Sequence, residues 1–363
     1  MSARYSFVIM AGGTGGHVFP ALAVAEQLRT LGHSVVWIGT PGGMEARLVP
    51  ARGLPMEWIT IGGLRGKGVM TLVLAPLRLV RALWQALKIL RRVKPQVVLG
   101  LGGFASGPGG LAAWLLRQPL VIHEQNAIAG LTNRLLAQLA DRVLQAFPDT
   151  FAKNTKTANV GNPVRREIAA LPPPQERLAN RSGQVHLLVL GGSLGALALN
   201  RGLPRALALL PPELQPLVRH QAGRSLEVAL QAYAEAGLAT KPEAFIDDMA
   251  GAYAWADLVV CRAGGLTIAE LAAAGLPAVL VPFPHAVDDH QTANAAYLVS
   301  AGAAVLIQER ELTAEKLAAC LRELISDRAR LQQMAAAARS RAWPDARDRI
   351  VSECLLLAAG ATA

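Results

Sequence analysis

The chain has 363 residues, a net charge of +10 and a hydrophobic fraction of 52%. This length is long for one domain and suits two domains with separate buried cores. The three cysteines are far apart and form no CxxC pair. This spacing argues against structural zinc and against a disulfide framework, and it fits a reducing compartment. No segment is long and apolar enough to predict a membrane-spanning helix.

The positive charge is concentrated in the first half of the chain. Residues 1–163 hold 17 lysines and arginines against 6 acidic residues, whereas residues 164–363 hold 19 against 20. Between Glu57 and Glu124 there are nine basic residues and no acidic one. The excess predicts an anionic partner for this half, such as phospholipid head groups, nucleic acid or a phosphorylated substrate.

The first elements follow the order strand, turn, helix, strand. Residues 5–10 are typical of a buried strand, a glycine-rich turn follows at 11–17, and a helix is predicted over 20–30. The turn fails the G-x-G-x-x-G pattern of dinucleotide binding because position 18 is valine, which makes a nicotinamide oxidoreductase improbable. No P-loop motif occurs in the chain. The turn suits either a bound phosphate or a tight connection without a ligand.

Residues 65–94 combine a basic loop, an apolar segment and a helix predicted over 77–93. A polar stripe on this helix is expected to lie opposite a core-facing apolar stripe. The polar stripe is Arg78, Arg81, Gln85, Lys88 and Arg92, and the apolar stripe is Val80, Leu83, Leu87 and Leu90. The bland interpretation is a solvated surface helix. The long acid-free run favours docking on an anionic membrane surface instead, at ~1 kcal/mol per well-placed lysine or arginine. No recognition module or aromatic platform supports nucleic acid as the partner.

A second glycine-rich loop, at 100–110, follows a strand predicted at 97–99. The next strand, at 120–122, ends in His123-Glu124-Gln125-Asn126. Open α/β sheets bind ligands at the carboxyl ends of their strands, so these polar residues are a site candidate. The alternative is a His–Glu pair that holds a loop together.

The pattern restarts in the second half, after a joint at 160–165. A strand at 186–190, a glycine turn at 191–195 and a helix to 209 mirror the beginning of the chain. The remaining predicted elements are short strands at 217–221 and 244–246, a helix from Asp247, and a long helix over 315–341. We therefore expect an α/β protein of two Rossmann-like, doubly wound domains, 1–163 and 164–340. A C-terminal helix over 341–363 is expected to pack back toward the first domain.

Residues 258–281 predict a further βαβ unit, with a strand at 258–260, a glycine turn at 263–265, a helix over 266–274 and a strand at 278–281. Such a turn aims backbone N–H groups and a partial positive charge of ~0.5 at whatever lies over the strand ends, which favours phosphate. Glu270, expected in the first helical turn, suits either a ribose diol or a capping box with Thr267. A polar set follows the last strand, namely His285, Asp288, Asp289, His290, Gln291 and Asn294.

Several of these segments together resemble the MurG family of bacterial N-acetylglucosamine transferases. They are GGTGGHVFP at 12–20, HEQNAIAGLTN at 123–133, GNPVR at 161–165, GGSLGA at 191–196, FIDDM at 245–249, and the run from 262 to 295. The similarity extends from end to end, and the motifs are ordered and specific. It implies a GT-B fold, in which two domains face a central cleft.

The resemblance also implies roles for individual residues. Glu270 would bind the ribose hydroxyls, the Ile246 backbone the uracil, and Gln291 the sugar. The diphosphate would be held by Ser193, Gly265, Leu266, Thr267, Ile268 and Ala269. The donor site would be completed from the first half by Thr14, Gly15, Gly16, Asn126 and Arg165. His17 is the expected general base, and Glu124 is a second catalytic candidate that would orient the acceptor. Phe104 stands where a tyrosine is expected in many relatives, which removes a phenolic hydrogen bond to the acceptor.

The implied reaction is an inverting, single-displacement transfer in peptidoglycan synthesis, with links to cell shape and division. N-acetylglucosamine would move from UDP-N-acetylglucosamine to the 4-hydroxyl of a lipid-linked N-acetylmuramyl-pentapeptide, at the cytoplasmic face of the inner membrane. No cofactor and no metal are expected, and Asp247-Asp248 is the place where an ion ligand would have to be sought. The alternatives are a diacylglycerol glycosyltransferase and a UDP-N-acetylglucosamine epimerase, which would need no acceptor.

Overall fold

The computed structural model describes residues 3–62, 74–179, 181–192 and 195–360, and the chain divides into two compact units. The first unit comprises Met1–Arg165 and Pro344–Ala363, and the second comprises Arg166–Trp343. None of the helices in these described ranges is long and apolar enough to cross a bilayer.

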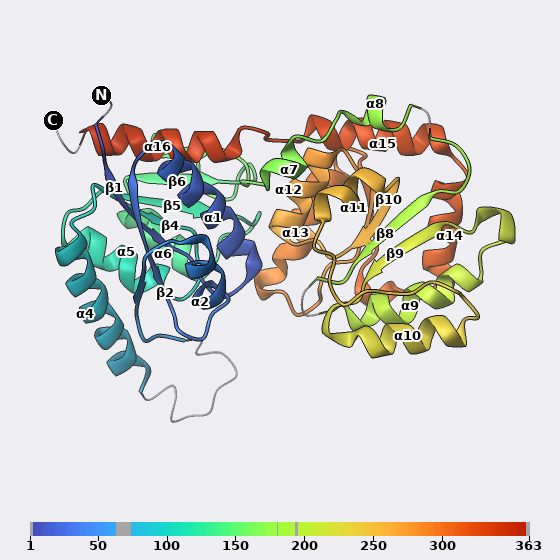
Figure 1. Ribbon diagram of the computed structural model, residues 1–363, viewed down its shortest axis with the longest axis horizontal. Helices are drawn as coiled ribbons and strands as arrows, with labels where there is room; N and C mark the ends of the chain where they lie inside the picture. The colour runs from blue at the N-terminus through green and yellow to red at the C-terminus, as the bar shows by residue number, and fades with distance from the viewer. Residues whose placement is uncertain (1–2, 63–73, 180, 193–194, 361–363) are drawn as a thin grey trace. The chain divides into compact units, whose positions relative to one another are not determined.

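The first unit is built on a parallel sheet whose described strands run in the order β3-β2-β1-β4-β5-β6-β7 (Figure 1). Its strands are β1 (Ser6–Met10), β2 (Ser34–Gly39), β3 (Met56–Trp58), β4 (Val97–Gly100), β5 (Leu120–Glu124), β6 (Arg142–Gln145) and β7 (Thr157–Asn159). The apolar runs form interior strands because side chains on both faces are covered by helices, as parallel sheets require.

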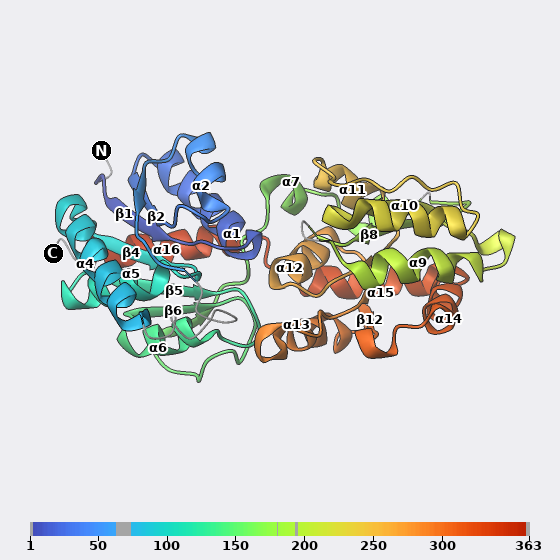
Figure 2. The same ribbon diagram turned by 90° about the horizontal axis from the view of Figure 1, so that it is seen from below.

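Helices cover both faces of this sheet (Figure 2). Phe7 and Ile9 of β1 pack with α1 (Gly15–Thr30) and α16 (Ala346–Gly360). Val8 and Met10 point the other way, toward α4 (Ala75–Val93), α5 (Ser106–Leu115) and α6 (Leu131–Leu139). The short elements α2 (Glu45–Leu48) and η1 (Pro50–Arg52) lie between β2 and β3. The C-terminal helix α16 thus belongs to the first unit, where Glu353 pairs with Arg142 at 3.2 Å.

Helix α4 occupies the predicted range, but the predicted stripes on it are partly wrong. Its buried side chains are Ala82, Ala86, Ile89 and Leu90, whereas Val80 is exposed. Gln85 belongs to the inner side, because its Oε1 accepts a hydrogen bond from the Thr60 backbone at 2.8 Å. The core contact uses small alanines, so the larger apolar side chains of the first turns are left on the surface.

The second unit has a parallel sheet of described strands in the order β12-β11-β10-β8-β9. They are β8 (His186–Leu190), β9 (Leu217–Gln221), β10 (Leu258–Cys261), β11 (Ala278–Leu280) and β12 (Ala304–Leu306). The predicted strand at 244–246 is wrong, since only a single parallel bridge joins Glu243 to Gln221. Pro242 precedes this bridge and has no N–H to donate to a ladder, which explains the short pairing.

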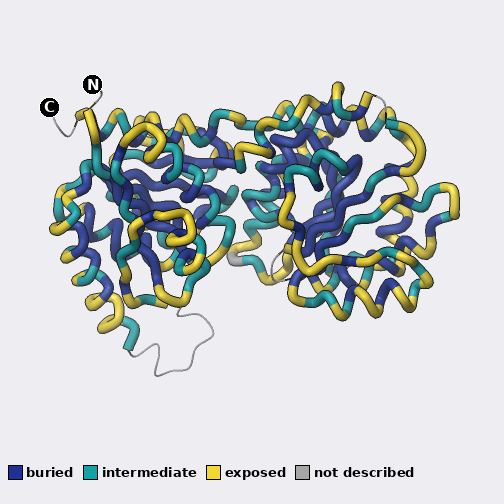
Figure 3. The backbone as a smooth tube through the Cα atoms, in the orientation of Figure 1, coloured by how far each residue is buried: buried dark blue, intermediate teal, exposed yellow. Residues whose placement is uncertain are grey.

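The helices of the second unit include α9 (Leu197–Ala208) and α14 (Ala314–Ile325), whose apolar faces share one core with alternate residues of β8 and β10. The others are α7 (Arg166–Ala169), α8 (Pro174–Arg177), η2 (Pro212–Leu214), η3 (Gly223–Ser225), α10 (Leu226–Glu235), α11 (Met249–Trp255), α12 (Gly265–Ala274), η4 (Val287–Asp289), α13 (His290–Val299), η5 (Glu309–Glu311) and α15 (Arg328–Ser340). The single long helix predicted over 315–341 is two helices, because Asp327 caps α15 by accepting from the Arg330 amide at 2.9 Å. Figure 3 shows that the central strands of both sheets are buried.

Candidate functional site

The two glycine loops of the first unit meet at the point where its strand order reverses. One follows β1, the other follows β4, and these strands are neighbours. Gly103 has a φ of +84°, and a Cβ there would lie 2.4 Å from the Gly12 oxygen. The two loops therefore pack backbone against backbone, which only glycine permits. Such a switch point is where open α/β sheets place ligands.

His17 lies in the first turn of α1, which begins at Gly15, earlier than predicted. Thr14 is the N-cap, and its carbonyl accepts from the His17 and Val18 amides at 3.1 Å. The His17 Nδ1 lies 3.3 Å from the Gly12 carbonyl oxygen. Because a carbonyl only accepts, a hydrogen bond here requires the proton on Nδ1, and in that tautomer Nε2 is the ring nitrogen that can accept a proton. A Cβ at position 102 would come within 3.1 Å of Nε2, so glycine keeps that side of the ring open.

Glu45 is a site residue that the sequence did not reveal. Its side chain has no exposed surface. The carboxylate accepts from the Gly13 amide at 3.0 Å, the Thr40 amide at 3.0 Å and the Thr40 hydroxyl at 2.8 Å. Glu45 therefore ties the first glycine loop to the loop after β2. No motif marks it, because its partners are mostly backbone amides.

Glu124 is buried, and hydrogen-bond donors surround its carboxylate. Oε1 accepts from the Asn126 amide at 3.0 Å and from Asn126 Nδ2 at 3.2 Å. Oε2 accepts from the Gly130 amide at 3.2 Å and Asn133 Nδ2 at 2.9 Å. Four donors favour the loop-holding interpretation over proton transfer, and they place Asn126 beside Glu124. A catalytic role for Glu124 and a donor-binding role for Asn126 stay predictions.

His123 extends the same arrangement toward the joint at 160–165. Its Nε2 donates to the Gly161 carbonyl at 2.9 Å, and its Nδ1 accepts from Gln125 Nε2 at 2.9 Å. The pKa of His123 is lowered to about 4, mainly by burial, while the Gly161 hydrogen bond and Glu124 raise it and the nearby His17 lowers it. Asn162 Nδ2 donates to the Gln125 carbonyl at 2.9 Å. The half-buried Arg165 follows directly after this anchored stretch.

The second unit repeats the switch-point arrangement with different residues. The loops after β8 and β10 follow neighbouring strands on which the order reverses. A Cβ at Gly223 would lie 2.4 Å from the Gly195 nitrogen, so another pair of loops packs through glycine backbones. The predicted phosphate ligand Ser193 lies outside the described residues.

Helix α12 begins at Gly265 with Gly264 as its N-cap, so the capping box predicted for Thr267 and Glu270 is wrong. Glu270 lies in the second turn, not the first. It is 5% exposed, and its Oε2 accepts from the Tyr253 hydroxyl at 3.0 Å. A capping box would need Thr267 at the N-cap position, but Gly264 occupies that position. This leaves the ligand interpretation of Glu270, which stays a prediction.

The predicted diphosphate cradle coincides with the first turn of α12. The Ile268 amide already donates to the Gly264 carbonyl at 2.9 Å, as the first bond of the helix. The amides of Leu266 and Thr267 precede that bond, and a helix leaves such amides pointing outward along its axis. Within the predicted set 265–269, these are the amides best placed to meet an anion, and Ala269 lies further along the helix.

Ile246 and Gln291 both lie at the carboxyl edge of the second sheet. The Ile246 side chain is buried, yet within the described residues its backbone N–H and C=O make no hydrogen bond. Gln291 Oε1 accepts from the Phe283 amide at 2.9 Å and the Ala263 amide at 3.2 Å. Because the Phe283 and Ala263 amides both donate to this Gln291 atom, it is the oxygen. The Nε2 donor is then on the other side of the side-chain amide.

A buried polar chain supports the loop around Gly223. Asn200 Nδ2 donates to the Ala222 carbonyl at 2.9 Å, and Asn200 Oδ1 accepts from His220 Nε2 at 3.0 Å. His220 Nδ1 accepts from the Tyr233 hydroxyl at 3.1 Å. Burial lowers the pKa of His220 to about 4 and raises the pKa of Tyr233. The imidazole is therefore neutral in the folded protein at physiological pH.

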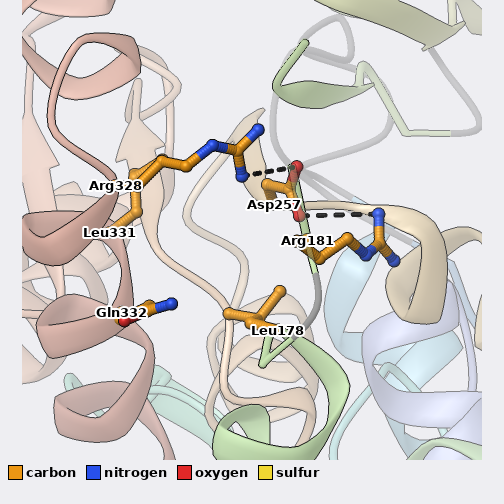
Figure 4. Close-up of a pocket in the computed structure, with 6 residues that line it drawn as sticks. All are labelled: Leu178, Arg181, Asp257, Arg328, Leu331 and Gln332. Atoms are coloured by element: carbon orange, nitrogen blue, oxygen red, sulfur yellow. Dashed lines mark ion pairs between the residues drawn. The ribbon is translucent and has the colours of Figure 1, made fainter. Parts of the chain in front are cut away.

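Two further acidic positions have structural roles. Asp257 lies between two guanidinium groups in a small pocket of the second unit, 3.5 Å from Arg181 and 4.0 Å from Arg328 (Figure 4). None of the predicted site residues lines this pocket. Asp248 caps α11 by accepting from the Gly251 amide at 2.8 Å. In the described part of the chain, no group of three histidine, cysteine or acidic residues could hold a metal ion.

Comparison with known proteins defines the class of this chain. Residues 7–145 match the glycosyltransferase family 28 N-terminal domain, and residues 186–350 match the glycosyltransferase family 28 C-terminal domain. The chain therefore belongs to glycosyltransferase family 28, and it has the GT-B fold that the sequence predicts.

Individual relatives are similar over nearly their whole length. The UDP-N-acetylglucosamine--N-acetylmuramyl-(pentapeptide) pyrophosphoryl-undecaprenol N-acetylglucosamine transferase of Marinobacter nauticus is 57% identical over 99% of both chains. The protein of the same description from Nitrosococcus oceani is 59% identical over 97% of this chain and 99% of its own. The crystal structure of Acinetobacter baumannii MurG has a TM-score of 0.84 and 42% identity, and covers 97% of this chain and 100% of that one. The resemblance that the motifs predict is thereby confirmed.

The buried side chains of His123 and His220 predict a loss of stability in mild acid. Both have pKa values lowered to about 4, so the unfolded chain binds protons that the folded chain excludes. Their contribution is complete above the unfolded pKa near 6.5 and is lost as the pH falls toward 4. Each of the two histidines should lower the free energy of unfolding by about 2 kcal/mol between pH 7 and pH 5. Urea unfolding followed by tryptophan fluorescence at both pH values measures the loss.

His220→Gln tests this prediction, because it removes one of the two titrating imidazole rings, the one in the second unit. Its unfolding midpoint should depend less on pH than that of the parent chain. Parallel profiles for the two proteins between pH 7 and pH 5 would contradict this assignment.

Proposed function

We propose that this chain is an inverting hexosyltransferase that moves N-acetylglucosamine from UDP-N-acetylglucosamine to the 4-hydroxyl of undecaprenyl-diphosphate-linked N-acetylmuramyl-pentapeptide. This step converts lipid I to lipid II in peptidoglycan synthesis. The relatives that are 57% and 59% identical carry this donor and this acceptor in their names. UDP-N-acetylglucosamine 2-epimerases share the fold at 15% identity and a TM-score of 0.69, and this likeness extends to the fold alone.

The supporting observation in the structure is the set of donors and acceptors at the switch point of the second sheet. The first turn of α12 offers amides and the positive end of a helix dipole to a diphosphate. Ile246 offers one backbone N–H and one C=O, the pair that a uracil edge can bind. Glu270 offers a buried carboxylate, oriented by Tyr253, to the ribose hydroxyls. These groups match the three parts of a uridine diphosphate.

His17 would act as the general base in the transfer. Its Nδ1 is committed to the Gly12 carbonyl, so Nε2 would take the proton from the 4-hydroxyl as that oxygen attacks the anomeric carbon. The bond between the anomeric carbon and the diphosphate oxygen breaks in the same step, with inversion to a β-1,4 linkage. Charge growing on the departing UDP would be stabilised by the outward-pointing amides of α12.

Helix α4 would dock the protein as a peripheral protein on the cytoplasmic face of the inner membrane. Leu77, Val80 and Trp84 are 68%, 65% and 61% exposed, and their spacing places them on one side of the helix. Arg78, Arg81 and Lys88 are exposed on the same helix, and no acidic residue lies on α4. Exposed apolar side chains among cations fit an anionic bilayer surface. The apolar part of the predicted segment up to residue 73 lies outside the described residues.

Glu270→Gln tests the donor site. The substitution keeps the side-chain size but removes the charge from the acceptor of the ribose hydrogen bonds, which are worth about 1.5–3 kcal/mol each. The dissociation constant for UDP should rise at least ~10-fold in isothermal titration. Glu227→Gln, on the exposed side of α10, is the matched control and should bind like the parent. An equal affinity for UDP in the parent chain and the Glu270 variant would show that Glu270 does not bind the nucleotide.

His17→Ala tests the base. Turnover should fall by ~10²–10⁴ because a positioned base contributes that much to proton transfer. UDP binding should change much less than turnover, since the proposed uracil, ribose and most diphosphate contacts belong to the second unit. Turnover is measured with the lipid-linked acceptor and compared with the thermal unfolding midpoint. A folded variant with normal turnover would show that another group takes the proton.

Simultaneous replacement of Leu77, Val80 and Trp84 by serine tests the docking surface. Cosedimentation with vesicles that contain anionic lipid should weaken at least ~10-fold, because burial of each side chain contributes roughly 1.5–3 kcal/mol. Replacing the exposed Leu209, Leu217 and Leu230 of the second unit by serine gives the control. Vesicle binding that is equal in both triple variants would rule out α4 as the contact.

A further inference from the structure

We propose that Glu45 is a positioning residue that sets the orientation and tautomer of His17. The inference rests on the proposed function only through the role of His17. Glu45 lies on α2, and His17 lies on α1; strand β2 separates these two helices in the sequence. Its carboxylate reaches the first glycine loop directly, through the Gly13 amide at 3.0 Å.

The pocket around Glu45 is shaped to hold a carboxylate in one place. A Cβ at Gly12 would lie 2.5 Å from Oε1, and one at Gly43 would lie 2.0 Å from Oε2. A Cβ at Gly39 would lie 2.8 Å from Cγ. Three glycines therefore make room for a side chain with no exposed surface. In the described ranges, no lysine or arginine pairs with it, so amides and one hydroxyl provide its stabilisation.

The two carboxylate oxygens have different partners, which makes the group hard to replace. Oε2 accepts from Gly13, whereas Oε1 accepts from the amide and the hydroxyl of Thr40. A glutamine has only one oxygen, so its NH₂ group would face a backbone N–H on one side or the other. The loss of an acceptor for a buried donor costs about 1–3 kcal/mol, and movement of the loop relieves it.

Movement of this loop would change the contact that His17 depends on. The Gly12 carbonyl accepts from His17 Nδ1 at 3.3 Å, and the N–H of the same peptide group, on Gly13, is the one that Glu45 holds. On its other side, Gly12 is packed against Gly103. Glu45 and the second glycine loop therefore hold the Gly12–Gly13 peptide from two sides. The position of this peptide determines which ring nitrogen carries the proton.

Two neighbouring glycines give a matched pair of variants that leave Glu45 itself in place. Gly43→Ala introduces a methyl group 2.0 Å from Oε2 and must displace the carboxylate. Gly42→Ala introduces the same group where no atom lies within 4 Å. Neither position has a positive φ, so backbone strain does not separate the two variants. Glu45→Gln is the direct variant, and Glu26→Gln on the exposed side of α1 is its control.

The decisive readout is the tautomer of His17 in long-range ¹H–¹⁵N spectra of histidine-labelled protein, with His17→Ala used to assign the signal. We expect Gly43→Ala and Glu45→Gln to lose the single Nδ1–H tautomer and to lower kcat between about 10-fold and 100-fold, because small misplacements of a catalytic group have effects of that size. The KM for UDP-N-acetylglucosamine should change less than kcat, because most of the proposed donor contacts belong to the second unit. Gly42→Ala and Glu26→Gln should match the parent chain.

An unchanged His17 tautomer in folded Gly43→Ala or Glu45→Gln protein would overturn the proposal, even if the melting temperature falls. This result is independent of catalysis. Failure of the proposed base would instead appear as normal turnover in His17→Ala, while the spectra would still report whether Glu45 orients the ring.

Discussion

Buried carboxylates that accept hydrogen bonds from neutral donors are the interaction on which both sites depend. Glu45, Glu124 and Glu270 are all buried, and their described partners are amides, side-chain amides and hydroxyls. A buried charge is costly unless such donors surround it. Glu45 and Glu124 therefore fix the loops that supply their donors, whereas Glu270 joins α12 to α11 through Tyr253. The result is a set of stiff loops at the carboxyl edges of two parallel sheets. Loops of this kind can hold a substrate without a large loss of entropy on binding.

Glycine provides the other half of this arrangement. At the switch point of the first unit two loops approach closely enough that a Cβ at Gly103 would collide with backbone; in the second unit the same close approach, at Gly223, joins the loops after β8 and β9. In the first unit Glu45 therefore fixes a loop that glycine has already brought close to its neighbour, and His17, the proposed base, follows this loop. In the second unit the start of α12, the proposed diphosphate site, follows the loop after β10.

The sequence revealed the sheets and the family because both depend on local signals. Apolar runs followed by glycine turns predicted β1, β4, β8 and β10, and the ordered motifs predicted the family. Contacts between distant segments were not predictable in the same way. Glu45 has no motif because it binds backbone, and Tyr253 reaches Glu270 from another helix. The inner face of α4 was only partly predicted: Leu83, Leu87 and Leu90 pack against the core, but Val80 is exposed and alanines share the buried face. The capping box at Thr267 failed because a glycine had already taken the N-cap position.

The central claim is the transfer of a sugar from a nucleotide to a lipid-linked sugar, and product analysis tests it most directly. The purified chain is given UDP-N-acetylglucosamine labelled in the sugar with the lipid-linked muramyl-pentapeptide, with diacylglycerol, or with no acceptor, and the products are identified by mass spectrometry and NMR. The account predicts a β-1,4-linked disaccharide on the muramyl lipid and equimolar UDP, with no product in the other two reactions. A glycosylated diacylglycerol, or an epimerised nucleotide sugar formed without acceptor, would contradict it.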